Sequence, residues 1–355
     1  MKLWCYDDDG RIQTEGYNKY ILNAGSFATI THNLNQELNT LGKLGTEQEA
    51  DTVIFTSGLK WDFGFSHRTR VLINVWESNI LPEILIAFRK RLEKYGKYHV
   101  MGLSDQISNL WTETGYHTPT VDIGADTEFW KPSLAKKADK FTILSVTSCN
   151  FRSGIEQTIG AFIKAADKDN DMRLIIKNTD ERAKRLPFII EDARIQGYDI
   201  QYICRRMNLM EIRDLMASSH VLAYNVHHTS AGLPVLEAAA MELPCIVGNF
   251  CPTNGYPVCE TLSCLPVPIT RLKPYLCGEW GLPYTFDGLG VNEDKAFLYW
   301  FEEAEFAEKL LKMKHSYANY IEKAKECRKQ VLERWTWKHS CEQLITNLRK
   351  IGYEI

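Results

Sequence analysis

Short apolar runs alternate with amphipathic segments along most of the chain. In the first third, Asp51–Ser57 and Arg70–Val75 have the length and β-branched content of buried strands, and Tyr17–Leu41 has apolar residues at helical spacing. The same pattern predicts helices at Ile84–Tyr95 and Asp105–Thr114, and strands at His99–Leu103 and Thr120–Ile123. Such alternation predicts an α/β fold in which helices cover both faces of a parallel sheet.

A polar break at Gly124–Lys140 separates this half from a second alternating series. The break contains Pro132 and the run K-K-A-D-K, which are typical of an interdomain linker. Beyond it, strands are predicted at Phe141–Val146, Met172–Lys177, Ile200–Cys204, Val221–Val226 and Cys245–Val247, and helices at Gly154–Ala166, Glu181–Tyr198, Leu209–Ser218, Ala304–Gln330 and Ser340–Gly352. We therefore predict two Rossmann-like, doubly wound domains, at 1–135 and 136–335. The helix in 336–355 is expected to pack back toward the first domain.

Composition narrows the class of protein. A chain of 355 residues exceeds what one compact core usually supports, and a net charge of −3 argues against a general nucleic-acid-binding surface. No apolar run approaches the roughly 18–20 residues that span a bilayer, and the charged start is not that of a secretory signal. The ten cysteines contain no C-x-x-C pair. We expect reduced thiols in a cytoplasmic protein.

One stretch, Thr229–Pro244, carries the clearest chemistry. It follows one predicted strand and precedes another, and it combines a glycine-containing loop with a helix that has Pro near its first turn and Glu237 inside that turn. A strand–loop–helix unit places backbone N–H groups at the carboxyl edge of a parallel sheet, where phosphates bind. Glu237 could then accept hydrogen bonds from a pair of sugar hydroxyls.

This stretch, T-S-A-G-L-P-V-L-E-A-A-A-M-E-L-P, resembles the donor-binding signature of glycosyltransferase family 4, E-G-F-G-L-P-x-x-E-A-M-A-x-G-x-P. The matching positions are Gly232, Leu233, Pro234, Glu237, Ala238, Ala240 and Pro244. The family consists of retaining enzymes with the GT-B fold, in which two Rossmann-like domains face a cleft. The resemblance implies that Glu237 binds the ribose and that Thr229, Ser230, Ala231, Gly232, Leu233 and Pro234 line the sugar and phosphates. The first Glu of the signature is Thr229 here.

The same resemblance supplies basic residues for the departing diphosphate. The segment R-S-G-I-E-Q-T-I-G-A-F is similar to the family's K-G-x-x-x-L-I-x-A-F, with Arg152 one position before the family Lys. Lys177 ends a predicted strand, where its side chain would reach the cleft. We name both as catalytic candidates that act without a metal; the alternative for each is a solvated surface cation.

Further candidates rest on shorter matches. Glu77, in N-V-W-E-S-N-I-L-P, is a third catalytic candidate, expected to bind a sugar or acceptor hydroxyl, or else to cap the next helix. Gly16 matches a glycine that approaches the donor phosphate. Arg206 and Met207 belong to a loop that would pack near the base. The basic segment 88–97 fits either contact with an anionic surface, peripheral to a membrane, or a solvated helix face.

The resemblance implies transfer of a hexose or pentose from a nucleotide-diphosphate sugar, UDP- or GDP-linked, to an acceptor hydroxyl with retention of configuration and no bound metal or other cofactor. The acceptor stays open among saccharide, lipid-linked saccharide, protein and modified nucleic acid. Two alternatives remain. A nucleotide-sugar-binding protein without transfer activity would fit the Thr229 change. A different Rossmann-type enzyme, such as a dehydrogenase, lacks support because no G-x-G-x-x-G follows a first strand.

Overall fold

The computed structural model divides the chain into two units. The described residues are 2–6, 26–45, 49–57, 69–74, 85–86, 89–90, 93, 98–133, 135–147, 153–178, 185–227, 229, 232–249, 262–274 and 297–354. The first unit includes Met1–Gly124 and Arg334–Ile355, and the second includes Ala125–Pro274 and Phe297–Glu333. The division falls between residues 124 and 125, earlier than the boundary that the sequence predicts between 135 and 136.

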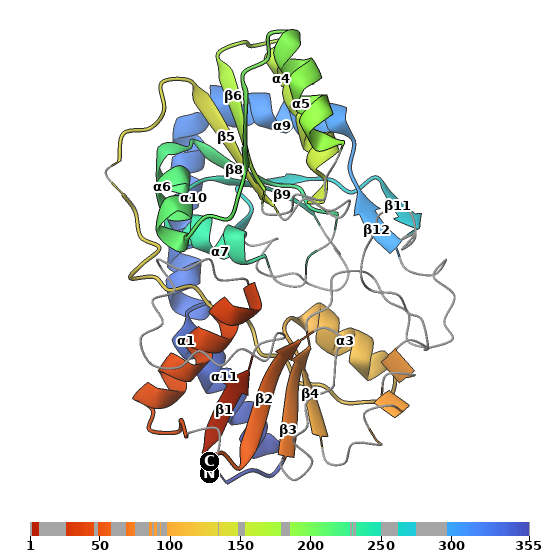
Figure 1. The fold of residues 1–355 in the computed structure, drawn as a ribbon, viewed down its shortest axis with the longest axis vertical. Coiled ribbons are helices and arrows are strands. Elements are labelled where there is room, and N and C mark those ends of the chain that lie inside the picture. The colour runs from red at the N-terminus through yellow and green to blue at the C-terminus, as the bar shows by residue number, and fades with distance from the viewer. Residues whose placement is uncertain are drawn as a thin grey trace. The chain divides into compact units, whose positions relative to one another are not determined.

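The first unit is built on a four-stranded parallel sheet in the order β1-β2-β3-β4 (Figure 1). Its strands are β1 (Leu3–Tyr6), β2 (Thr52–Ser57), β3 (Thr69–Asn74) and β4 (Tyr98–Gly102). Its helices are α1 (Ser26–Thr40), α3 (Asp105–Glu113) and α11 (Trp337–Lys350). Helix α1 packs against β1 and β2, and α3 packs against β4. The apolar run Val71, Leu72 and Ile73 is fully buried, as expected for a central parallel strand.

The carboxyl-terminal helix belongs to the first unit. Helix α11 packs against α1, and its Gln343 exchanges two hydrogen bonds with Asp122, at 2.8 Å to the backbone N–H and 3.0 Å to the carboxylate. Asn347 donates to the carbonyl oxygen of Thr120 at 2.7 Å. These two amide side chains therefore hydrogen-bond to backbone and carboxylate groups of the segment Thr120–Ile123, which the sequence predicts to be a strand.

The second unit contains a six-stranded parallel sheet in the order β10-β9-β8-β5-β6-β7. Its strands are β5 (Phe141–Thr147), β6 (Met172–Asn178), β7 (Ile200–Cys204), β8 (Val221–Tyr224), β9 (Cys245–Gly248) and β10 (Leu265–Val267). A separate antiparallel pair joins β11 (Arg271–Pro274) to β12 (Phe297–Trp300). Most of these apolar strands are buried on both faces because helices cover the sheet (Figure 1).

Six helices of the second unit have described bounds. They are α4 (Ile155–Ala166), α5 (Leu186–Ile195), α6 (Leu209–Ser218), α7 (Leu233–Ala240), α9 (Glu303–His315) and α10 (Tyr317–Arg334). Helix α4 packs against β6, α5 and α9, and α7 packs against β8 and β9. None of the described helices is long and apolar enough to cross a lipid bilayer.

Several predicted elements differ from the observed ones. Thr120–Ile123 is not a strand, because Thr120 makes only an isolated bridge with Gly102. The single helix predicted over Ala304–Gln330 is divided at Ser316, whose backbone leaves helical geometry at φ −119° and ψ 30°. The helix predicted over Glu181–Tyr198 is shorter among the described residues and begins at Leu186, with Pro187 in its first turn.

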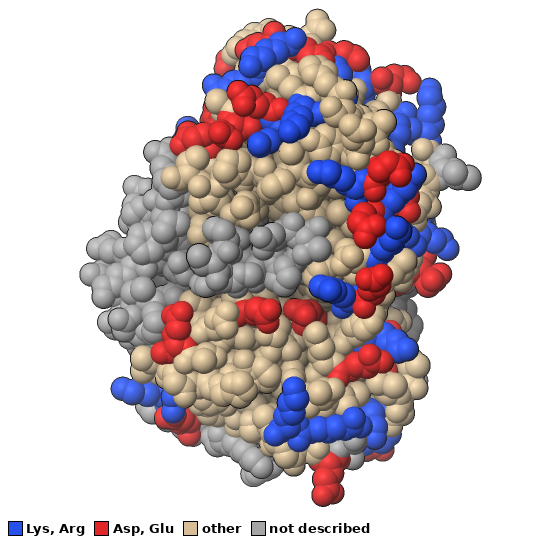
Figure 2. Space-filling model, turned by 180° about the vertical axis from the view of Figure 1, so that it is seen from behind, with Lys and Arg blue, Asp and Glu red and all other residues tan. Residues whose placement is uncertain are grey.

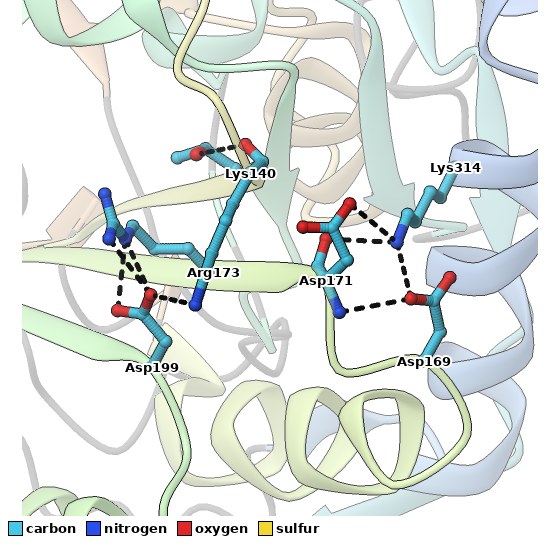
Figure 3. A network of polar contacts seen from close by, with 7 residues as sticks. Lys140, Asp169, Asp171, Arg173, Asp199 and Lys314 are labelled. Atoms are coloured by element: carbon cyan, nitrogen blue, oxygen red, sulfur yellow. Dashed lines mark hydrogen bonds and ion pairs between the residues drawn. The ribbon is translucent and has the colours of Figure 1, made fainter.

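Ion pairs link the amino ends of β5, β6 and β7 in the second unit (Figure 3). Asp199, before β7, accepts hydrogen bonds from Arg173 of β6 at 3.0 Å and from Lys140, before β5, at 2.9 Å. Beside them, Lys314 of α9 pairs with Asp169 at 2.6 Å. These charged groups satisfy one another at the amino edge of the sheet.

Charges on the described surface are mixed in sign. On the face shown in Figure 2, Lys and Arg side chains lie among Asp and Glu side chains, in keeping with the net charge of −3. In the basic segment 88–97, Arg89 pairs with Glu93 at 3.0 Å and its guanidinium lies 5.7 Å from the ring centre of Tyr116. This arginine is therefore engaged within the chain.

Candidate functional site

The strand order of the second unit reverses between β5 and β8. From β5 the chain proceeds outward through β6 to β7, and from β8 it proceeds the other way through β9 to β10. In a doubly wound sheet the loops at such a point leave in opposite directions and open a crevice at the carboxyl ends of the two strands. The reversal places the candidate site at the carboxyl ends of β5 and β8.

Two helices begin at this point without a capping side chain. Helix α4 follows Gly154, which has φ 59° and ψ 22°, and α7 follows Gly232, which has φ 74° and ψ 48°. Both glycines have a left-handed backbone conformation, and neither has a side chain that could accept a hydrogen bond from the first N–H groups of its helix. These N–H groups, together with the positive end of each helix dipole, form a suitable environment for an anion.

The neighbouring helix α6 is capped internally. The Asn208 side chain accepts from the Glu211 N–H at 2.9 Å, and the Glu211 carboxylate accepts from the Asn208 N–H at 2.9 Å. This capping box uses donors that would otherwise be available to a ligand. The contrast with α6 favours α4 and α7 as the helices that receive an anionic group.

Gly154 also brings the start of α4 against the end of β8. A Cβ at Gly154 would collide with the carbonyl oxygen of Asn225, the residue that follows β8. The same Cβ would lie 3.2 Å from the ring of Phe301. The absence of a side chain therefore allows the two loops of the candidate site to approach each other.

Glu237 lies one turn deeper in its helix than the sequence predicts. The first turn of α7 begins at Leu233 and contains no acidic residue, so the prediction of a first-turn glutamate was wrong. The helix already begins at Leu233, four residues before Glu237, because Gly232, in the left-handed region, is its N-cap. Stabilisation by the helix dipole is greatest within the first turn, so the position of Glu237 gives it little of that effect. Its side chain is buried, with 8% exposure.

Thr229 occupies the position of the first glutamate of the donor signature. It is buried, with 7% exposure, and its hydroxyl accepts from the Tyr224 hydroxyl at 3.4 Å. The threonine thus contacts the last residue of β8. A neutral hydroxyl stands here in place of a carboxylate.

Lys177 is a buried cation near the carboxyl end of β6. Its exposure is 3%, and its pKa is lowered to about 8, chiefly by burial and also by the nearby charge of Arg205, while Glu211 opposes the shift. Among the described residues, its ammonium group forms no ion pair. An ammonium group held in this way would gain from a nearby anion, because burying an uncompensated charge is costly.

The loop after β7 contains Arg205 and Arg206, which differ in their contacts. Arg205 pairs with Glu211 at 2.7 Å, so it supports the capping box of α6. Arg206 is exposed and Met207 is half-buried. Leu233 and Pro234 begin α7 beside Gly232. Gly16, Glu77, Arg152, Ser230 and Ala231 lie outside the described residues.

Sequence reasoning missed Asn225. The run V-L-A-Y-N-V predicts one strand ending at Val226, which would make Asn225 part of the sheet, but β8 ends at Tyr224. Asn225 is 2% exposed, and neither Nδ2 nor Oδ1 has a hydrogen-bond partner in the described part of the chain. A polar residue at the end of an apolar strand was the available signal.

The fold defines the class of protein. The chain has the GT-B fold, with parallel α/β sheets in both units. Residues 126–260, which lie within the second unit, match the family model described as "Glycosyl transferases group 1". No curated protein sequence matches the chain.

Solved structures give the same fold at low sequence identity. S. aureus TarM, solved with UDP and other ligands, is 11% identical with a TM-score of 0.59, and the match covers 90% of this chain but only 59% of TarM. The pneumococcal O-GlcNAc transferase GtfA, solved with UDP and GlcNAc, is 14% identical with a TM-score of 0.58 and coverages of 98% and 67%. An E. coli protein bound to UDP-2-fluoro glucose is 13% identical with a TM-score of 0.61 and coverages of 91% and 78%.

Proposed function

We propose that this protein transfers a sugar from a nucleotide-diphosphate sugar to an acceptor hydroxyl. The observation that carries the proposal is the convergence of two helix starts without capping side chains, at Gly154 and Gly232, on the point where the strand order reverses. A diphosphate has the charge and the acceptor oxygens that such a site requires. The glycosyltransferase group 1 match over residues 126–260 supports the same assignment.

The departing nucleoside diphosphate is the group whose charge must be stabilised. The N–H groups at the starts of α4 and α7 would donate hydrogen bonds to its oxygens, and Lys177 would supply a positive charge that water screens little. Arg152 is proposed for the same task from its resemblance to the family's basic residue. Because these groups are fixed by the fold, they require little reorganisation as the bond to the sugar breaks.

Glu237 is proposed to bind the ribose of the donor. A buried carboxylate needs hydrogen-bond donors, and a ribose presents two neighbouring hydroxyls that can both donate to it. Gly16, Arg206, Met207, Thr229, Ser230 and Ala231 are proposed to line the rest of the donor, and Glu77 to bind a sugar or acceptor hydroxyl. Retention of configuration and independence from a metal belong to this proposal.

The first test is a thermal-shift panel of UDP-, GDP-, ADP- and CMP-linked sugars. A ligand that binds the folded chain at a hundred times its Kd raises the free energy of unfolding by about 2.7 kcal/mol. UDP-glucose and UDP-N-acetylglucosamine are placed first, because solved proteins of this fold were obtained with UDP and GlcNAc or with UDP-2-fluoro glucose. We expect a rise in Tm with one nucleotide sugar. No rise with any of them would contradict the proposal.

A second candidate function is nucleotide-sugar binding without transfer. Thr229 favours it, because the carboxylate of the donor signature is absent and the hydroxyl that replaces it already contacts Tyr224. Hydrolysis of the bound donor separates the two functions. Release of free sugar over hours, measured by chromatography, supports an enzyme, whereas tight binding without any release supports the second candidate.

A further inference from the structure

The side chain of Asn225 is buried without a partner at the carboxyl end of β8. Its exposure is 2%, and within the described residues both Nδ2 and Oδ1 lack a hydrogen bond. Buried polar groups in folded proteins are nearly always satisfied, so each exception needs an explanation. Here the exception occurs next to the start of α4, since the Asn225 carbonyl oxygen lies against Gly154.

The carboxamide limits which ligand groups could satisfy it. Nδ2 donates two hydrogen bonds and Oδ1 accepts, so a complete partner must offer both an acceptor and a donor. A diphosphate oxygen only accepts and would face Oδ1 without a proton between them. Neighbouring sugar hydroxyls both donate and accept, so one can accept from Nδ2 while the next donates to Oδ1. The carboxamide therefore fits sugar hydroxyls better than phosphate.

The position of Asn225 selects the transferred sugar rather than the ribose. The diphosphate is assigned to the starts of α4 and α7, and the ribose to Glu237 in the second turn of α7. Asn225 lies instead on the loop that leaves β8, four positions before Thr229, where the donor signature has its first glutamate. Thr229 offers only a hydroxyl that already contacts Tyr224. The Asn225 carboxamide has hydrogen-bonding capacity that none of the described residues uses.

We propose that the Asn225 carboxamide binds hydroxyls of the transferred sugar and takes over part of the role of the missing glutamate. This inference rests on the proposed function and assigns sugar recognition within the same site. The carboxamide is closed off in this structure, so binding must include a local rearrangement of the residues around it. A neutral amide in place of a carboxylate also predicts a preference for sugars that present both donors and acceptors at this point.

The test compares Asn225→Leu with the unaltered chain. Leu has a similar shape and no polar atom, so removing an unsatisfied buried group should leave Tm unchanged or raise it. Affinities are measured by calorimetry for UDP and UDP-glucose, and for GDP and GDP-mannose if the thermal panel favours guanine. We expect at least a tenfold loss of affinity for the nucleotide sugar and less than a threefold change for the matching nucleoside diphosphate.

Tyr317→Phe provides a matched control at the opposite end of the same sheet. The Tyr317 hydroxyl is also buried without a hydrogen-bond partner among the described residues, and its ring contacts Phe141 and His220 at the amino ends of β5 and β8. Its removal should leave Tm unchanged or raise it, with no change in either affinity. A general effect of removing an orphan polar group would therefore appear in both variants.

The outcomes separate the two proposals. If the unaltered chain binds no nucleotide sugar, the proposed function fails. If it binds and Asn225→Leu keeps the same ratio of nucleotide-sugar to nucleoside-diphosphate affinity, the inference about Asn225 is wrong. An equal loss for both ligands would assign Asn225 to the nucleotide and would also overturn it. A fall in Tm with an unchanged ratio would make Asn225 a structural residue satisfied by water.

Discussion

Gly154 lies so close to Asn225 that a Cβ on the glycine would collide with the carbonyl oxygen of the asparagine. Gly154 is the N-cap of α4, and Asn225 is the first residue after β8. The contact therefore joins the two chain segments that diverge where the strand order reverses. It fixes how closely the open end of α4 can approach the loop that leads to α7.

Replacing Gly154 with alanine should damage both the fold and ligand binding. The variant adds the strain of a side chain at φ 59° to a collision with Asn225, and we expect a loss of about 2 kcal/mol or more in the free energy of unfolding. Gly197→Ala is the control, because Gly197 has φ 95° and nothing within 4 Å of an added Cβ. Urea denaturation measures the free energy of unfolding of the two glycine variants. Equal losses would mean that the contact with Asn225 adds nothing.

The carboxylate of Glu237 should determine nucleotide affinity. Hydrogen bonds to a charged group contribute about 1.5–3 kcal/mol, so Glu237→Gln is expected to weaken nucleoside diphosphate binding roughly tenfold to a hundredfold. Glu211→Gln is the matched control, since Glu211 caps α6 and pairs with Arg205. That variant should lower Tm and leave affinity unchanged. Unaltered affinity in Glu237→Gln, measured by calorimetry, would refute the assigned role.

Donor affinity should fall as the pH rises from 7 to 9. The pKa of Lys177 is lowered to about 8, chiefly by burial, so its ammonium is mostly charged at pH 7 and mostly neutral at pH 9, and its protonated fraction changes about tenfold. A diphosphate that depends on this charge keeps the ammonium protonated while it is bound, so binding at pH 9 must take up the missing proton and should be about tenfold weaker than at pH 7.

Two lysine variants test whether this pH dependence of binding comes from Lys177. Lys177→Met should bind weakly at every pH with a flat profile. It should be no less stable at pH 7, because a lysine with a depressed pKa destabilises the fold while it is charged and ceases to do so above its unfolded pKa. The pKa of Lys137 is also lowered to about 8 by burial, but Lys137 donates to Ser219, before β8. Lys137→Met should keep the original pH profile of binding, and a flat profile there would contradict the role of Lys177.

The Asp199 carboxylate should contribute stability at neutral pH that is lost in acid. Burial alone would raise its pKa, but hydrogen bonds from Arg173 and Lys140 outweigh burial and hold the pKa below its ordinary value (Figure 3). A lowered carboxyl pKa stabilises the fold above the unfolded pKa, and this stabilisation disappears as the pH falls through the folded value.

Asp199→Asn tests this contribution. We expect a loss of about 0.5–1 kcal/mol at pH 7, since the pair is partly exposed to water, and a difference that shrinks below about pH 4. Urea denaturation at several pH values measures it. Nucleotide affinity should not change, because the pair lies at the amino edge of the sheet. A constant difference across the pH range would show that the carboxyl charge is not responsible.

Local pattern determined the type and place of most elements in the second unit. The strand at Ile200–Cys204 and the helix at Leu209–Ser218 have the bounds that the sequence predicts. The GT-B fold followed from the alternation of such segments and from the resemblance of Thr229–Pro244 to a donor signature.

Only the tertiary structure decided which residues meet. Strand order depends on pairing between distant segments, so the sequence could not place β8 beside β5 or bring Gly154 against Asn225. The left-handed Gly232 moved Glu237 into the second turn of α7. The end of β8 at Tyr224 left the Asn225 carboxamide buried beyond the strand. Periodicity reports which face of an element is covered, whereas these outcomes depend on contacts that form only when the elements pack together.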